Sequence, residues 1–257
     1  MSSAVDFGLT AVDYSKHRAG FPPSLFDRLA HWGIGQSGQQ VVDVGTGTGT
    51  LARGFAARGC QVIGIDPAHS LLDQAQQLTK DEGLTVDYRV GRAEQTGLPD
   101  AWADVVSAGQ CWHWFDRPAA ARELARILCP DGYLVIAHFD WLPLAGNVVA
   151  GTEALIQAYN PNWQLGGGTG LYGQWLRDLG EAGYRAIESF SYDLNVAYSH
   201  AAWRGRIRAS AGVGASLPPE RVEAFDQGLT SLLQHMHPAP LLQIEHRVFA
   251  VVARPPL

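Results

Sequence analysis

Hydrophobic and polar residues alternate in two distinct patterns along the chain. Short apolar runs rich in valine and isoleucine, such as 41–44 and 61–66, are followed by longer segments whose apolar residues recur every three or four positions. The unbroken runs are typical of parallel strands buried on both faces, and the spaced residues are typical of helices with one apolar face. Their alternation predicts an α/β fold built on a mostly parallel sheet.

The predicted elements continue this alternation towards the end of the chain. Strands are expected at 41–44, 61–66, 86–90, 103–108, 133–137, 186–194 and 244–253. Helices are expected at 24–32, directly after 49, and at 71–78, 118–128, 148–159, 175–182, 203–210 and 220–233. The last two helices form a long insertion between the sixth and seventh strands, and such insertions commonly act as lids.

A glycine-rich turn follows the first strand, where VVDVGTGTG covers residues 41–49. The glycines leave little side chain in the turn, so a ligand can approach backbone N–H groups near a helix N-terminus. A dinucleotide-binding fingerprint needs the longer Gly-x-Gly-x-x-Gly spacing, and a P-loop needs Gly-Lys-Ser/Thr. The glycine spacing here matches neither motif.

The form Asp-x-Gly-x-Gly-x-Gly, beginning at Asp43, resembles motif I of the class I S-adenosylmethionine (SAM)-dependent methyltransferases. The resemblance implies that Gly45, Thr46 and Gly47 receive the methionine part of SAM and that Asp43 helps to hold its ammonium group. It also implies a Rossmann-like, seven-stranded, mostly parallel sheet with helices on both faces. The last strand is then antiparallel, and the insertion between strands six and seven forms a helical lid.

An acidic residue ends the second predicted strand at Asp66 and is followed by Pro67, and both are candidate cofactor contacts. It lies about twenty residues beyond the glycine turn, where a nucleotide-binding α/β fold places an acceptor for ribose hydroxyls. A carboxylate can accept from two vicinal hydroxyls at once. The alternative is that Asp66 only opens the next helix, with Ser70 as a cap.

The turn after the third predicted strand has the sequence Gly91-Arg92-Ala93-Glu94. In the family that motif I resembles, the equivalent turn meets the adenine ring. Arg92 stands where an acid is common, so the resemblance assigns the adenine contact to the backbone of Ala93 and to Glu94.

The N-terminal run YSKHRAGFPP at 14–23 resembles the Tyr-x-x-x-Arg-Pro-x-Tyr-Pro arm of one methyltransferase subfamily, type 11-like, which includes relatives of trans-aconitate methyltransferases. Ala19 and Phe21 depart from that motif. The resemblance places Tyr14 and Arg18 at the cofactor, with Arg18 paired to its carboxylate. The alternative is a solvated arm.

The segment after the fourth predicted strand, QCWHWFD at 110–116, resembles the Gln-Ala-x-His-Trp-Phe-Asp stretch of the same subfamily. Ligands gather at the carboxyl ends of parallel strands, so this segment should face the reacting centre. The resemblance places Gln110 near the methionine side of the cofactor. His113, and His138 after the fifth strand, are candidate catalytic bases because the pKa of histidine lies near physiological pH. The alternative for both is a packing role.

Acidic residues exceed basic ones, 25 against 19, which argues against a nucleic-acid partner. The short cluster Arg204, Arg206 and Arg208 is a poor footprint for one, and no Asn/Asp-Pro-Pro-Tyr stretch follows the fourth strand. A small-molecule methyl acceptor is therefore expected, with an aromatic pocket drawn from Trp112, Trp114, Trp141, Trp163, Trp175 and Trp203.

The three cysteines lack metal-ligand spacing, so no metal is expected and a reduced cytoplasmic setting is the simplest interpretation. No signal-peptide layout and no apolar run of ~20 residues is found, which argues against a membrane partner. We expect a single domain over 1–257, divided into an arm and helix (1–35), a cofactor-binding core (36–140) and a substrate side (141–257). Oligomeric state and acceptor atom (O, N or C) stay open.

Three alternatives belong to other functional classes. A NAD(P)-dependent Rossmann oxidoreductase would share the α/β core and Asp66, but it predicts the longer glycine spacing. A SAM-binding protein without methyl transfer would keep motif I and need no acceptor site. An enzyme of this fold could also use bound SAM for chemistry other than methyl transfer.

Overall fold

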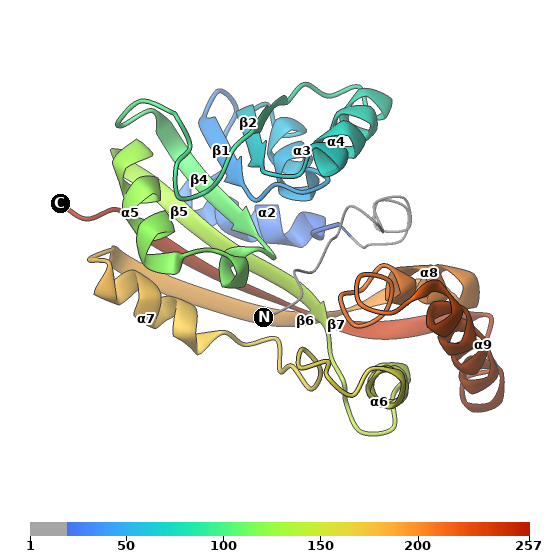
Figure 1. Cartoon of the computed structure of the whole chain (residues 1–257). Coiled ribbons are helices and arrows are strands. Elements are labelled where there is room, and N and C mark those ends of the chain that lie inside the picture. The colour runs from blue at the N-terminus through green and yellow to red at the C-terminus, as the bar shows by residue number, and fades with distance from the viewer. Residues whose placement is uncertain (1–19) are drawn as a thin grey trace. The chain divides into compact units, whose positions relative to one another are not determined.

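A computed structural model of the chain describes residues 20–257 (Figure 1). The strands are β1 (Gln40–Val44), β2 (Gln61–Asp66), β3 (Asp87–Val90), β4 (Ala103–Gly109), β5 (Leu128–Trp141), β6 (Arg185–Ser199) and β7 (Leu241–Arg254). The helices are α2 (Pro23–Leu29), α3 (Thr50–Ala56), α4 (His69–Asp81), α5 (Arg117–Ile127), α6 (Val148–Tyr159), α7 (Gly173–Glu181), α8 (His200–Arg208) and α9 (Pro219–Met236). Two 3₁₀ turns are η2 (Ala30–Trp32) and η3 (Trp112–Trp114).

The strands form one seven-stranded sheet in the order β3-β2-β1-β4-β5-β7-β6. Strand β1 pairs in parallel with β2 and β4, and the pairs β2–β3 and β4–β5 are parallel as well. The last strand, β7, is antiparallel and lies between β5 and β6. This is the Rossmann-like sheet that the sequence predicts, so the fold class is confirmed.

The described chain divides into two compact units. The larger unit contains residues 20–139, 172–192 and 248–257, and the smaller unit contains residues 140–171 and 193–247. Three of the boundaries between them fall inside β5, β6 and β7, and the fourth lies between Leu171 and Tyr172, before α7. The expectation of a single domain over 1–257 stays a prediction.

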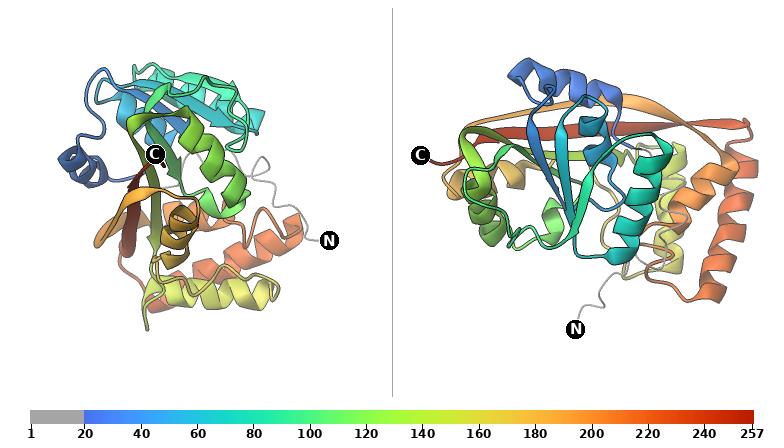
Figure 2. Two further views of the ribbon diagram at one scale, coloured as in Figure 1. Left: turned by 90° about the vertical axis from the view of Figure 1, so that its left-hand side faces the viewer. Right: turned by 90° about the horizontal axis from the view of Figure 1, so that it is seen from above.

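In the larger unit, the valines of β1 show why an unbroken apolar run forms a central strand. Val41, Val42 and Val44 are fully buried. Val42 and Val44 pack in one cluster with Leu124 of α5 and Leu179 of α7. Side chains alternate along a strand, so Val41 faces the opposite side of the sheet. Figure 2 shows α2 and α5 on opposite sides of these strands, as helices on both faces require.

The fifth strand begins earlier than the sequence predicts. Leu128 pairs with Ala103, and the next pairing joins Tyr133 to Val105. The Cys-Pro-Asp-Gly stretch at 129–132 is therefore a bulge within β5. The predicted bounds, a helix to 128 and a strand over 133–137, left this stretch outside both elements and are wrong here. Proline and glycine disturb the ladder without ending it, because the chain resumes the same pairing direction after the bulge.

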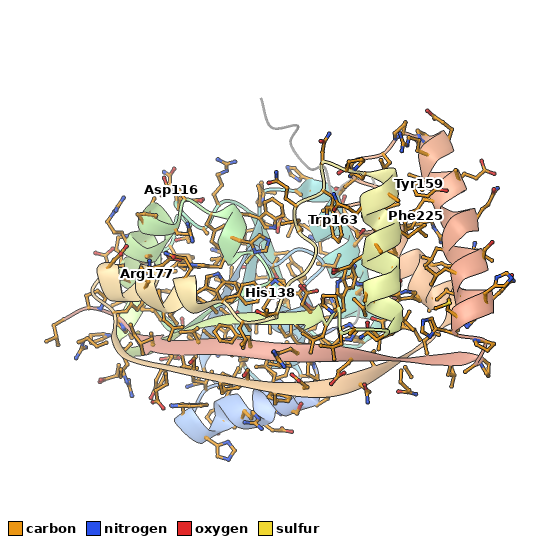
Figure 3. The ribbon with its side chains drawn as sticks, turned by 90° about the horizontal axis from the view of Figure 1, so that it is seen from below. Asp116, His138, Tyr159, Trp163, Arg177 and Phe225 are labelled. Atoms are coloured by element: carbon orange, nitrogen blue, oxygen red, sulfur yellow. The ribbon has the colours of Figure 1, made fainter. Side chains whose placement is uncertain are left out.

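In the smaller unit, α6, α8 and α9 enclose a second hydrophobic core. Tyr159 of α6 meets Phe225 of α9 edge-on, with ring centroids 5.6 Å apart (Figure 3). Asp226 of α9 accepts from Arg204 and Arg208 of α8. Two of the three arginines in the basic cluster are thus engaged in joining two helices. The predicted insertion between strands six and seven is helical, and its role as a lid stays a prediction.

One glycine of α3 is required by the packing of α2 against it. A Cβ at Gly54 would lie 2.0 Å from Cζ of Phe26, which is buried. We expect Gly54→Ala to lower the free energy of unfolding by about 1–3 kcal/mol, as overpacked cores generally do. Urea denaturation of the purified protein measures this change.

Gly180 of α7 provides the matched control, since no heavy atom lies within 4 Å of its Cβ position. Gly180→Ala should raise the free energy of unfolding by up to about 1 kcal/mol, because alanine loses less entropy in a helix. A gain of similar size at both positions would contradict the packing argument.

Candidate functional site

The loop from β1 to α3 leaves the carboxyl end of β1. Its glycines Gly45, Gly47 and Gly49 all have positive φ, at 61°, 54° and 79°. A Cβ at Gly45 would lie 2.8 Å from Sγ of Cys111, and one at Gly49 would lie 2.2 Å from the Tyr88 hydroxyl. At Gly47 no heavy atom lies within 4 Å of that position. Among these glycines, Gly47 is the one whose backbone has open space beside it.

Asp43, at the end of β1, is buried, with a side chain held by two hydroxyl groups. Its Oδ2 accepts from Oγ1 of Thr46 at 2.6 Å, and its Oδ1 accepts from Oγ of Ser107 at 2.7 Å. Burial raises the pKa of the Asp43 carboxyl to about 6, and the two hydroxyl donors limit that rise. The side chain of Thr46 is therefore used to orient Asp43.

Asp66, at the end of β2, is also buried and reaches across to the glycine loop. Its Oδ2 accepts from the N–H of Gly47, and its Oδ1 from the N–H of Ala68, both at 2.9 Å. Burial raises the pKa of the Asp66 carboxyl, and these two donors lower it. Pro67 is exposed, and Ser70 lies inside α4 and does not cap it.

The turn after β3 lies beside the end of β2, because the N–H of Gly91 donates to the carbonyl of Asp66 at 3.2 Å. Ala93 is buried. Oε1 of Glu94 accepts from the backbone N–H of Asp116, the N-cap of α5, at 3.0 Å (Figure 3). Of the two residues that the sequence assigns to the adenine contact, Glu94 thus forms a side-chain hydrogen bond to the start of α5.

Gln110 has a positive φ of 59°, which is uncommon for a residue other than glycine. Its N–H donates to the carbonyl of Ala137 at 2.8 Å, and its Nε2 donates to the carbonyl of Phe139 at 2.9 Å. These bonds join the end of β4 to β5. Residues held in such conformations cluster at ligand sites, where the surrounding structure compensates for the strain.

The two histidines singled out from the sequence lie together. The ring centroids of His113 and His138 are 5.9 Å apart. His138 is buried, and its Nδ1 lies 3.0 Å from the hydroxyl of Tyr172 (Figure 3). His113 is exposed and lies against Trp114, at 4.7 Å between centroids. Two imidazoles, from the segment after β4 and from β5, and one hydroxyl, from Tyr172 before α7, therefore lie in one place.

The tryptophans divide between packing and this cluster. Trp112 and Trp203 are fully buried, and Nε1 of Trp112 donates to Asp178 at 3.1 Å, so both are core residues. Trp175 stacks on Tyr172, with centroids 4.3 Å apart, and lies 5.8 Å from the ring of His138. Trp114 is 49% exposed beside His113. Trp114 and Trp175 are thus the members of the larger unit next to the histidines.

Two predicted cofactor contacts, Tyr14 and Arg18, lie outside the described residues. Phe21, which departs from the tyrosine of the arm motif, is described. Its ring packs beside Gly109 and lies 6.4 Å from the ring of Phe139. Phe21 therefore lies next to the last residue of β4 and next to β5.

Sequence reasoning missed Ser107 and Tyr172. Ser107 is the one hydroxyl residue in the buried stretch of β4, and that interruption of an apolar run was an available signal. Tyr172 precedes α7, and nothing in the local sequence indicates that it reaches His138. Its contact depends on tertiary structure alone.

Within residues 20–257, no group of three or more His, Cys, Asp or Glu side chains is arranged to hold a metal ion. No disulfide joins two cysteines of this range. No helix in the same range is long and apolar enough to cross a bilayer.

The residues at the ends of β1 and β2 fit SAM. Asp43 and Asp66 are buried, and neither forms an ion pair with a cation of the described chain. Each carboxylate has accepting capacity beyond the two hydrogen bonds it already receives. SAM carries a ribose diol, an ammonium and a sulfonium, which match carboxylates of this kind. The space beside the backbone of Gly47, which bonds to Asp66, is open.

Comparison with known proteins decides the family. The family model described as a methyltransferase domain matches residues 42–136. An uncharacterized methyltransferase of Mycobacterium tuberculosis is 34% identical over 152 residues, covering 57% of this chain and 59% of that protein. A ubiquinone biosynthesis O-methyltransferase of Xanthomonas oryzae pv. oryzae is 30% identical over 181 residues, covering 68% and 72%. The chain belongs to the class I SAM-dependent methyltransferases.

A solved structure supports the fold of this methyltransferase. A protein from Anaeromyxobacter dehalogenans, described as a candidate type II methyltransferase, matches with a TM-score of 0.71 at 22% identity, covering 93% of this chain and 98% of that one. At this identity the match concerns the fold. The chain spans 59% of the length of the first curated relatives that it matches. The cofactor of the family is SAM, in agreement with the fit of the site.

The burial of Asp43 makes the stability of this methyltransferase depend on pH. Its pKa is raised from 3.8 to about 6 in the folded chain, so the folded state binds the proton more tightly than the unfolded state. The stability that the neutral carboxyl contributes is fully present at a pH below the pKa of Asp43 in the unfolded chain. It is lost as the pH rises through the pKa of Asp43 in the folded chain. Relative to Asp43→Asn, which does not titrate, the natural protein should lose about 3 kcal/mol across this interval, since each pKa unit corresponds to about 1.4 kcal/mol.

Urea denaturation of both proteins without cofactor, at several pH values from about 4 to about 7, measures the difference. The gap between the two free energies of unfolding should widen in favour of Asp43→Asn as the pH rises. A constant gap over the whole range would show that burial does not perturb Asp43.

Proposed function

We propose that the chain transfers the methyl group of SAM to a small-molecule acceptor. The observation that carries the proposal is the pair of buried carboxylates that bond to the glycine loop, Asp43 to Thr46 and Asp66 to Gly47, with open space at the Cβ position of Gly47. When bound, SAM supplies a methyl group that is already electrophilic, so the protein chiefly orients the acceptor and excludes water.

In this proposal Asp66 binds the ribose. Its two oxygens each accept one backbone N–H, from Gly47 and Ala68, and this fixes the plane of the carboxylate before any ligand arrives. The remaining lone pairs accept from the two ribose hydroxyls. Because the carboxylate is held in place by the backbone, little rotamer entropy is lost on binding.

Asp43 and the loop Gly45–Gly47 bind the methionine part. Thr46 and Ser107 hold the Asp43 carboxylate in one orientation, and its charge attracts the ammonium group of the cofactor. A bound cation lowers the pKa of a nearby carboxyl, so binding favours the ionised form that burial disfavours. Gln110 contributes from the end of β4, and the turn at Ala93 and Glu94, next to Pro67, contacts the adenine.

The acceptor side of the proposed site contains His113 and His138. Tyr172 holds the orientation of the His138 ring through its contact with Nδ1. In the proposal the imidazole of His138 takes a proton from the acceptor. His113 lies next to it at the surface and serves as the second acid–base group. The exposed flat ring of Trp114 suits an organic acceptor more than a phosphate backbone, and the buried Trp175 supports Tyr172 by stacking on it. A catalytic base is needed only where the acceptor is weakly acidic.

The proposal also covers the chemical class of the acceptor and the atom that is methylated. The resemblance of the His113 segment favours the subfamily that includes relatives of trans-aconitate methyltransferases. The relative from Xanthomonas is named an O-methyltransferase, which favours an oxygen acceptor. The proposal includes the cytoplasmic setting and the lack of a nucleic-acid partner that the sequence predicts. The pairing of Arg204 and Arg208 with Asp226 supports the lack of a nucleic-acid partner.

Replacement of Asp66 tests the cofactor assignment. Asp66→Ala should weaken SAM binding by roughly 1–3 kcal/mol, because charge-assisted hydrogen bonds to the ribose are lost. Isothermal titration with SAM and with S-adenosylhomocysteine measures the change, and NAD(P)H tests the oxidoreductase alternative. Asp73→Ala removes an exposed acid of α4 and should leave both affinities unchanged. Equal affinity in a folded Asp66→Ala protein would remove Asp66 from the site.

Replacement of His113 separates catalysis from packing. In the proposed mechanism His113→Ala lowers turnover by roughly 10²-fold or more, the usual contribution of a general base, with little change in SAM affinity. Turnover is followed as S-adenosylhomocysteine formation with an acceptor found by a product screen. Losses of activity and folding stability in parallel would favour the packing role. Acceptor conversion without S-adenosylhomocysteine would favour the chemistry other than methyl transfer.

A further inference from the structure

The smaller unit contains a hollow of its own, with a volume of about 450 Å³. One side is a face of α6, and the other side is the glycine-rich segment that follows Trp163. The lining residues are Pro143, Ala150, Glu153, Ala154, Gln157, Trp163, Gln164, Gly166 and Gly167. All of them lie within residues 140–171, so the hollow is complete within one unit.

Glu153 is the distinctive residue of this hollow. Its side chain lies on α6, yet the residue is only 8% exposed. Oε1 accepts from Nε1 of Trp141 at 2.8 Å, and Oε2 accepts from the N–H of Gly167 at 2.7 Å. No cationic side chain of the described chain pairs with it, and burial raises the pKa of its carboxyl.

Three carboxylates are buried in the described chain, namely Asp43, Asp66 and Glu153. The first two belong to the proposed cofactor site, where the ligand brings positive charge and hydroxyl donors. Burial of an unpaired carboxylate costs several kcal/mol, and two neutral donors recover only part of that cost. Glu153 is likewise a buried carboxylate that receives only neutral donors, and the proposed cofactor site does not include it.

The other lining groups suit the ammonium group of an organic cation. Gln157 lies one helical turn beyond Glu153, on the same face of α6. Its Nε2 donates to the carbonyl of Pro161 at 2.8 Å, which leaves its amide oxygen as an acceptor. The indole of Trp163 is held between Gly166 and Gly212, where a Cβ would approach it to 2.7 Å and 3.0 Å (Figure 3). A fixed indole face attracts cations.

We propose that this hollow binds a small organic cation, with a primary ammonium group against Glu153 and its alkyl part against Trp163. The carboxylate and the amide oxygen of Gln157 accept from the N–H groups of the ammonium. The inference goes beyond the proposed function, because every lining residue lies outside the larger unit and binding requires no SAM.

A purely structural role for Glu153 makes a different prediction. As a tether, Glu153 would only connect Trp141 and the N–H of Gly167 to α6, and the hollow would show no preference for charge. A cation site instead discriminates between an alkylammonium ion and the neutral alcohol of the same length. The charge preference therefore decides between the two roles.

The experiment is an NMR titration of the full chain with n-butylammonium chloride and, separately, with butan-1-ol. The indole N–H of Trp141 and the backbone N–H of Gly167 are the reporters, since both donate to Glu153. We expect saturable shifts of both signals with the ammonium at concentrations on the order of 10 mM or below, and none with the alcohol.

Two variants test the residues and two others serve as controls. Glu153→Gln removes the charge and should weaken ammonium binding at least about tenfold. Ala154→Phe fills the hollow, leaves Glu153 in place and should have a similar effect. Glu223→Gln, an exposed acid of α9, and Ala158→Phe, an exposed position of α6 outside the hollow, should bind as the natural protein does.

Ala154→Phe keeps the test decisive if Glu153→Gln fails to fold, because position 154 is exposed and carries no hydrogen bond to the loop. Equal shifts with butan-1-ol, unchanged affinity in Ala154→Phe, or no saturable shift in the natural protein would each overturn the proposal. None of these results involves SAM, so they leave the proposed function to its own tests.

Discussion

The buried carboxylate of Asp43 is the constraint on which the arrangement of the larger unit depends. It is placed at the end of β1 and held by Thr46 from the glycine loop and by Ser107 from β4. A carboxylate buried in this way must be surrounded by hydrogen-bond donors. The end of β1, strand β4 and the loop between β1 and α3 are therefore fixed relative to one another. The same loop is tied to β2 as well, because the N–H of Gly47 donates to Asp66.

The sequence was sufficient for features that depend on local backbone conformation. The order of strands and helices, the glycine loop and the acids at 43 and 66 follow from short patterns that a chain can satisfy only in a few ways. It was insufficient where partners are distant along the chain. Ser107 lies 64 residues from Asp43, and Tyr172 lies 34 residues from His138, and neither pairing leaves a local signal. The early start of β5 at Leu128 was missed for a related reason, since pairing with Ala103 outweighed the local turn preference of proline and glycine.

The two candidate histidines illustrate how topology combines separate signals. His113 follows β4 and His138 lies within β5, and the sequence indicates each of them separately. Strands β4 and β5 are adjacent and parallel, with Ala108 opposite Ile136 and Gly109 opposite Ala137, so β4 ends level with the residue before His138. The rings consequently lie 5.9 Å apart, within reach of one acceptor. Parallel pairing of β4 and β5 therefore brings together two histidines that the sequence indicates separately, and Tyr172 contacts one of them.

Acidic residues in the described chain differ in what neutralises them: some are paired with arginines, and others receive only neutral hydrogen-bond donors. Asp226 is partly buried and receives two arginines, and Asp193 receives one, so their charges are neutralised within the fold. Asp43, Asp66 and Glu153 are more deeply buried and receive only neutral donors. A fold that needed these three acids solely for packing would be more stable with neutral side chains, since unpaired burial of charge is unfavourable. Their retention without cationic partners is most simply understood if positive charge, or a set of hydroxyl donors, is supplied by what binds beside them.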